Sequence, residues 1–146
     1  MTKWFVVHDL IHYERNKHLI GFDKSISTKN KAKKFIHLKV EDSNFYKIAK
    51  DDIIVYYGLG NGVIVGIFKV ISEKPFDFKG EYGDGLALEI EPLKEIEGSY
   101  LDFRRLLKTK SFESFDLQKC FKECYSIIED NHYEEIFKAF YDNSYH

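Results

Sequence analysis

Cysteine, proline and glycine are all scarce: the 146 residues include two Cys, two Pro and nine Gly. Two cysteines cannot build the disulfide framework of a small secreted protein, and so little Gly and Pro excludes a collagen-like or low-complexity chain. No hydrophobic run approaches the roughly 20 residues that a membrane span needs. The first residues turn polar too soon for a signal-peptide core. We therefore expect a cytoplasmic protein that has no membrane partner.

The two cysteines, Cys120 and Cys124, stand four residues apart and lack a nearby His pair at the spacing of a metal site. If this segment is helical, the two thiols lie one turn apart on the same side, which suits half-buried structural groups. We expect no metal and no cofactor.

Neither sign of charge predominates, because 22 Lys and Arg are balanced by 24 Asp and Glu, for a formal net charge of −2. This balance excludes a histone-like polycation that coats nucleic acid by bulk electrostatics. Positive charge nevertheless gathers in two stretches that hold no acid, residues 24–40 and 103–112. Such stretches can hold phosphates without reading sequence, although a charge run is usually an ordinary solvated surface.

Aromatic residues are abundant, at 13 Phe, 10 Tyr and one Trp, or 16% of the chain. They can form a generous core, and they can also wall a pocket, since a tyrosine fills space while its hydroxyl finds a partner. Composition leaves both interpretations open. With 44% hydrophobic and 32% charged residues, we expect a single domain over residues 1–146.

The clearest local signal is a β-hairpin whose strands, residues 53–57 and 63–71, are joined by the Gly/Asn-rich residues 58–62. A strand follows this glycine run, whereas a phosphate-binding loop needs a helix there, so we interpret the run as a turn. Both strands are almost continuously apolar, which favours coverage on both faces and a closed barrel.

Further elements are predicted around the hairpin from periodicity and capping residues. We predict strands over residues 3–8, 35–40 and 86–93, a short helix from residue 10 that is ended by Gly21, a polar loop over 25–34, a short helix over 100–107, and a last helix that begins at Asn131, where Glu134 completes a capping box. Residues 117–128 fit a helix or a strand. This order predicts an α+β fold, with a small mixed β-barrel flanked by short helices.

Four blocks of the sequence carry a resemblance to a known family. They are Trp4-Phe5-Val6-Val7, Lys50-Asp51-Asp52-Ile53-Ile54-Val55-Tyr56-Tyr57, Gly62-Val63-Ile64-Val65-Gly66-Ile67-Phe68-Lys69-Val70-Ile71-Ser72, and Asp102-Phe103 with Leu106. In this order and spacing they resemble the EVE domain family of the PUA-like superfamily, which is related to YTH domains. The likeness runs over nearly the whole chain and is closest to small stand-alone archaeal members.

The chain departs from the family pattern at three places. The family usually has Gly-Asp before the first hairpin strand, where this chain has Lys50-Asp51-Asp52. Phe22 stands nearest the position of a tryptophan that is common after the first helix, and Tyr82 near a cage tryptophan of the YTH relatives. These substitutions keep an aromatic face.

The resemblance implies a PUA-like module that binds DNA or RNA and holds a flipped, modified base, such as a methylated one, in an aromatic pocket. Rings at Phe22, Tyr57 and Tyr82 would sandwich the base, each stack being worth roughly 1–3 kcal/mol. His8, Asp9 and Asp23 would contact its polar edge. The phosphates would be held by the basic side chains Lys24, Lys29, Lys31, Lys33, Lys34, Arg104 and Arg105.

Plainer roles stay open for several of these residues. His8 can be a hydrogen-bonded residue at a strand end, Asp9 can cap the first helix, and Phe22 can belong to the core. Tyr56 and Tyr57 point to opposite faces of their strand, so one of them can face a pocket, and we favour Tyr57.

Two other classes of function stay open. A protein-interaction module would use exposed aromatic side chains. A metal-dependent nuclease or RNA-processing enzyme would need clustered carboxylates, yet Asp51 and Asp52 are adjacent and would point apart in a strand. No Gly-x-Ser-x-Gly motif marks a nucleophile. We therefore expect a binding module rather than an enzyme.

Overall fold

The computed structural model describes residues 1–15, 17–23, 44–80, 83–94 and 100–146, with residues 11, 12, 22, 23, 80, 83, 84 and 94 described by their backbone alone. The strands are β1 (Lys3–Asp9), β2 (Leu19–Asp23), β3 (Ile53–Leu59), β4 (Val63–Val70), β5 (Phe76–Gly80), β6 (Gly83–Lys94), β7 (Leu101–Asp102) and β8 (Tyr125–Ile127). The helices are α1 (Leu10–Arg15), α3 (Phe103–Leu107), α4 (Leu117–Glu123) and α5 (Asp130–Ala139), with 3-10 turns at Phe45–Lys47, Lys110–Phe112 and Asn143–Tyr145.

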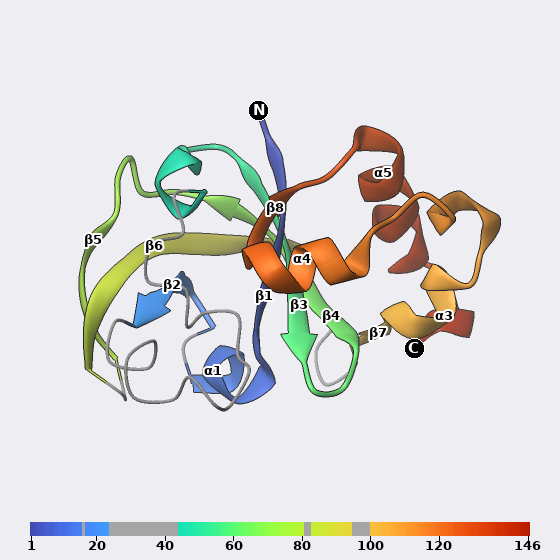
Figure 1. Ribbon diagram of the computed structural model, residues 1–146, viewed down its shortest axis with the longest axis horizontal. Coiled ribbons are helices and arrows are strands. Elements are labelled where there is room, and N and C mark those ends of the chain that lie inside the picture. The colour runs from blue at the N-terminus through green and yellow to red at the C-terminus, as the bar shows by residue number, and fades with distance from the viewer. Residues whose placement is uncertain (16, 24–43, 81–82, 95–99) are drawn as a thin grey trace.

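These elements form an α+β fold around a curled mixed sheet (Figure 1). Its strands pair in the order β2-β6-β4-β3-β1-β8, with β5 added to β6 and β7 to β4. β1 and β3 run parallel, and the other described pairs are antiparallel. The first half of β6 pairs with β2 and β5 and its second half with β4, so this long strand carries the curl.

The closed barrel predicted from the hairpin is found in part. Strand pairing within the described ranges does not lead from β8 back to β2, so the sheet is a half-barrel. Among the described residues, no helix is both long and apolar enough to cross a membrane.

The predicted hairpin is confirmed as β3 and β4. Its turn requires glycine at two places, because Gly60 and Gly62 have φ angles of 109° and 68°, in the left-handed region where a Cβ is strained. The pairing shifts register between Tyr56 and Tyr57, which places a bulge in the hairpin.

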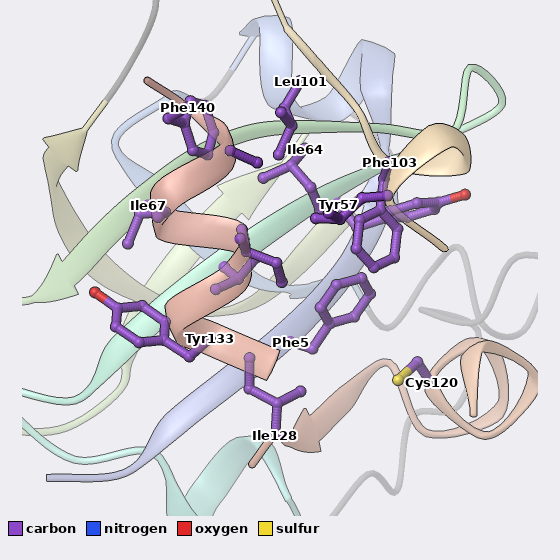
Figure 2. Packing of buried hydrophobic residues seen from close by; sticks show 14 of the residues in the cluster. Phe5, Tyr57, Ile64, Ile67, Leu101, Phe103, Cys120, Ile128, Tyr133 and Phe140 are labelled. Atoms are coloured by element: carbon purple, nitrogen blue, oxygen red, sulfur yellow. The ribbon is translucent and has the colours of Figure 1, made fainter. Parts of the chain in front are cut away.

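Alternate residues of β1 and β3 build two separate cores, because side chains alternate between the faces of a strand. Phe5, Val7, Val55 and Tyr57 join residues of α3, α4 and α5 in what we call the helix-side core (Figure 2). Trp4, Val6, Ile54 and Tyr56 join residues of α1, β2, β6 and β8 in what we call the strand-side core. The central strands are therefore covered on both faces, as their continuous hydrophobicity predicts.

Several predicted boundaries are wrong. Gly21 does not end the first helix, because α1 stops at Arg15 and Gly21 lies inside β2. The last helix begins at Asp130 rather than Asn131, with Glu129 at the capping position and no side-chain cap. Residues 100–107 contain β7 before α3.

The ambiguous segment 117–128 is in fact both α4 and β8. Cys124 separates the two elements with a φ of 61°, a conformation that stops a helix. The predicted loop 25–34 and strand 35–40 lie outside the described residues.

Candidate nucleic-acid interface

A buried polar network lies in the strand-side core, near the end of β1. The His8 side chain there is 2% exposed. Its Nε2 lies 2.8 Å from the hydroxyl of Tyr125, and its Nδ1 lies 3.2 Å from the hydroxyl of Tyr56. The Tyr125 hydroxyl also donates to the backbone carbonyl of Gly21, at 2.8 Å. One imidazole and two phenols thus connect β1, β3, β8 and β2.

The direction of these hydrogen bonds follows from counting protons. The Gly21 carbonyl can only accept, so it takes the single proton of the Tyr125 hydroxyl. The Tyr125 oxygen is then left to accept from His8 Nε2–H. In the neutral tautomer that carries this proton, Nδ1 accepts from the Tyr56 hydroxyl. Burial raises the pKa of Tyr56 well above its ordinary value, which keeps this hydroxyl protonated as the first donor.

His8 and Asp9 were both predicted to contact the polar edge of a base. The structure places His8 in the buried network, with both ring nitrogens within hydrogen-bond distance of tyrosine hydroxyls. Asp9 is the last residue of β1 and is partly exposed, and its charge is one of the factors that raise the pKa of Tyr56, after burial and Tyr13.

Of the two hairpin tyrosines, Tyr56 and not Tyr57 lies beside His8. In the parallel pairing of β1 with β3, Tyr56 is opposite Val6, two residues before His8, and therefore shares the face of His8. The ring of Tyr57 lies in the helix-side core, with centroids 5.6 Å from Phe5 and 6.0 Å from Phe103 (Figure 2). Tyr57 is 5% exposed, and burial raises the pKa of its hydroxyl.

A hollow of about 500 Å³ lies beside β5 and the first half of β6. Among the described residues its wall is formed by Asp77, Phe78 and Lys79 of β5 and Gly85 of β6. Gly85 pairs with Phe78 on one side and with Asp23 of β2 on the other. A residue without a side chain thus stands between the phenylalanine and the end of β2.

The other predicted pocket residues belong to the strands around this hollow or follow them in sequence. Phe22 and Asp23, described by their backbone, pair with Leu86 and Gly85. Lys24, Lys29, Lys31, Lys33, Lys34 and Tyr82 lie outside the described residues. In sequence, the lysine-rich stretch begins directly after Asp23, and Tyr82 stands between β5 and β6.

Arg104 and Arg105 lie elsewhere, on α3, at the opposite end of the molecule from β5 (Figure 1). Their side chains are 69% and 61% exposed, and both lie beside Asp102, with Nε–carboxylate distances of 3.3 and 3.8 Å. The stem of Arg104 covers the hairpin turn, because a Cβ on Gly62 would lie 3.0 Å from its Cγ and Cδ. Arg104 and Arg105 therefore do not form one surface with the hollow.

A second, smaller hollow of about 140 Å³ lies between α4, β8 and the start of α5. Its wall includes Ser114, Cys120, Ser126 and His132, and Ser114 Oγ lies 3.4 Å from His132 Nε2. Burial raises the pKa of the Cys120 thiol to about 11, so this sulfur is a neutral thiol near neutral pH and a poor nucleophile. Within the described ranges, no three His, Cys, Asp or Glu side chains are placed to hold a metal ion.

The sequence did not single out Phe78, Gly85 or Tyr125. The alternation of Phe76, Asp77, Phe78 and Lys79 was available as a sign of an edge strand with one aromatic face. Nothing local marks Tyr125, because its partners His8 and Gly21 are 117 and 104 residues away.

No protein-family model and no curated protein matches this chain. Solved structures do match it over nearly its full length. A hypothetical protein from Leishmania major has a TM-score of 0.68 at 11% identity, covering 99% of this chain and 97% of its own. The NMR structure of a protein from Rhodopseudomonas palustris has a TM-score of 0.62 at 12% identity, covering 100% of this chain and 99% of its own. The crystal structure of a protein from Pseudomonas putida has a TM-score of 0.59 at 12% identity, covering 94% of this chain and 99% of its own. At these identities the likeness establishes a shared fold.

Proposed function

We propose that the protein is a PUA-like module of the EVE type, which binds nucleic acid and takes up one flipped, modified base in the hollow beside β5 and β6. The observation that carries this proposal is the hollow itself. Its volume of about 500 Å³ lies in the range of roughly 300–1,000 Å³ that is typical of small-ligand sites.

The wall of the hollow has the chemistry that a base requires. Phe78 offers a ring, and the neighbouring Gly85 carries no side chain. A base stacked on such a ring gains roughly 1–3 kcal/mol. Asp77 and Lys79 also belong to the wall, and their side chains alternate with that of Phe78 along the strand. An added methyl group would fill more of the hollow and exclude water from it.

The positive charge that follows β2 in sequence suits the phosphates of a strand. β2 ends at Asp23, which pairs with Gly85 of the hollow, and the six lysines of residues 24–40 follow in sequence. Cations this close along the chain would hold flanking phosphates as point charges, without base preference. In this arrangement a ring selects the base, and the lysines supply salt-dependent affinity.

One detail supports the EVE assignment at a position where the sequence departs from it. The family has Gly-Asp before the first hairpin strand, and Asp51 stands at the glycine position with a φ of 73°. This conformation is easy for glycine and is tolerated by aspartate. Asp52 then accepts hydrogen bonds from Thr2 N–H, Trp4 Nε1–H and Ala49 N–H at 2.9–3.0 Å, which joins the first two blocks of the resemblance.

Binding of short oligonucleotides tests this function. Pairs of single strands that differ by one modified base should be measured by fluorescence anisotropy at several salt concentrations. We expect affinity that falls as salt rises, and a preference for at least one modified base over its parent.

The matched pair of variants is Phe78→Ala and Phe76→Ala on the same strand. Phe76 is 40% exposed and is not part of the described wall of the hollow. Phe78→Ala should lower the affinity for the preferred oligonucleotide about 5- to 100-fold, as expected for a lost stacking contact, and Phe76→Ala should not. Absence of binding at low salt, or equal losses in both variants, contradicts the proposal. Metal-dependent turnover of an oligonucleotide would instead favour a nuclease.

A further inference from the structure

We propose that the Tyr125 hydroxyl is a positioning group for the base site, because it holds β2 in place through the Gly21 carbonyl while His8 fixes the hydroxyl's direction. The inference rests on the proposed function and adds a residue from the far end of the sheet to it. No sequence pattern connects Tyr125 with the hollow.

β2 and β8 stand at the two ends of the strand order. The Tyr125 hydroxyl spans this gap, at 2.8 Å from the Gly21 carbonyl. It thereby satisfies a backbone acceptor on a strand whose described pairing is with β6. The Tyr125 ring is 1% exposed and packs against Phe45, with ring centroids 5.3 Å apart. Because the Tyr125 ring is buried and packed, its hydroxyl can hold β2 in a fixed position.

Gly21 is held closely from the side of β6 as well. A Cβ on this residue would lie 2.1 Å from the carbonyl oxygen of Leu86, so only glycine fits. β2 is thus fixed between the backbone of β6 and the hydroxyl of Tyr125. Two residues further on, Asp23 pairs with Gly85 in the wall of the hollow. A displacement of β2 at Gly21 would therefore reach the hollow directly.

The network also sets the proton on His8. Because the Tyr125 hydroxyl donates to Gly21, His8 must carry a proton on Nε2, and in the neutral ring Nδ1 then accepts from the Tyr56 hydroxyl. With the proton on Nδ1, the Tyr56 hydroxyl would lose its acceptor and Tyr125 would have to donate to two groups with one proton. The tautomer of His8 is consequently a direct reporter of the network.

The test compares Tyr125→Phe with Tyr133→Phe in the full chain. Tyr133 is also buried, at 9% exposed, but it lies in the helix-side core, and its hydroxyl makes no hydrogen bond to the part of the chain that the structure describes. Amide hydrogen exchange of residues 19–23, the affinity ratio between modified and unmodified oligonucleotides, and the salt dependence of binding are measured for each.

For Tyr125→Phe we expect exchange in β2 to rise about tenfold, as for one lost hydrogen bond, and the affinity ratio to fall by a similar factor. The salt dependence should stay unchanged, because the phosphate contacts are not altered. Tyr133→Phe should change none of the three. The affinity ratio separates a positioning role from a general loss of stability, which would weaken all oligonucleotides alike.

Two results would overturn the inference. Wild-type discrimination that persists in Tyr125→Phe overturns it while leaving the proposed function intact, whereas absence of discrimination in the wild type overturns both. If Tyr125→Phe does not fold, the nitrogen chemical shifts of His8 in the wild type decide, since a proton found on Nδ1 contradicts the network.

Discussion

The two faces of the central strands differ in how they hold the molecule together. On the helix-side core, rings pack on rings: Phe103 lies 5.4 Å from Phe5 and 5.5 Å from Phe112 between centroids, with no polar group required. On the strand-side core, Trp4, Tyr56 and Tyr125 carry polar atoms, and each is hydrogen-bonded to His8 or Asp52. β1 and β3 thus contribute to an apolar core on one face and to a hydrogen-bonded core on the other.

This difference suggests a division of labour. Apolar packing is non-directional and supplies most of the free energy of folding, whereas a satisfied polar network fixes one arrangement of its strands. The proposed base site adjoins the strands that the network fixes, and the helix-side core is remote from it (Figure 1). Substitutions on the two faces should therefore have different consequences.

The largest effect is expected for Phe103→Ala in the helix-side core. Phe103 is fully buried, so truncation should lower the free energy of unfolding by about 3–5 kcal/mol through lost contacts and a cavity. Urea unfolding followed by circular dichroism measures this loss. Folded Phe103→Ala should retain base discrimination, and a selective loss of discrimination would contradict the division between the two faces.

On the strand-side face, Asp52→Asn should lower the free energy of unfolding by about 2–3 kcal/mol. The variant loses charge-assisted hydrogen bonds, and the hydrogens of its new amide group would face donors. The carboxylate is 5% exposed and accepts from Thr2, Trp4 and Ala49. The fluorescence of Trp4, the single tryptophan, follows unfolding. The neighbouring Asp51→Asn, an exposed carboxylate, is the control, and equal losses in both variants would contradict the role of Asp52.

Tyr56→Phe should lower the free energy of unfolding by about 1 kcal/mol near neutral pH, which is the usual net contribution of one hydrogen bond. Burial raises the pKa of Tyr56 above 10.0, so above this pH the folded chain keeps a proton that the unfolded chain loses. Stability therefore falls as pH rises above 10.0, and it should fall less steeply in the variant. Parallel pH profiles of wild type and variant would show that Tyr56 is not buried as described.

The smallest effect is a gain. Asp51 has a φ of 73°, so Asp51→Gly should remove left-handed strain and raise stability by roughly 0.5–1 kcal/mol. Lys69 lies 3.3 Å from its carboxylate, but both groups are exposed and this pair adds little. Thermal unfolding measures the gain, and a decrease in melting temperature would argue against strain at this residue.

Local chemistry made part of the fold predictable. The hairpin followed from its turn glycines, and the strand predicted over residues 86–93 lies inside β6. The face of each hairpin tyrosine was not predictable, because alternation separates Tyr56 from Tyr57 but the pairing of β1 with β3 decides which of them joins His8. Cys124 ends α4 in a conformation that its residue type does not signal, which hid β8 and its Tyr125.

The site was less predictable than the fold for the same reason. Aromatic composition left a core and a pocket both open, whereas most of the described rings are buried between strands and helices, and the described ring in the hollow belongs to Phe78. The acid-free stretch at residues 103–112 suggested a phosphate surface next to the pocket, whereas α3 lies at the other end of the molecule. Sequence shows which residue types are present, and long-range pairing decides which of them meet.

Nuclear magnetic resonance titration of the isotope-labelled chain with a short oligonucleotide that carries the preferred modified base tests the central claim most directly. We predict that the amides of Asp77, Phe78, Lys79 and Gly85 shift with the modified oligonucleotide and far less with its unmodified parent. Shifts confined to α3, or to the hollow between α4 and α5, would contradict a base site on β5 and β6.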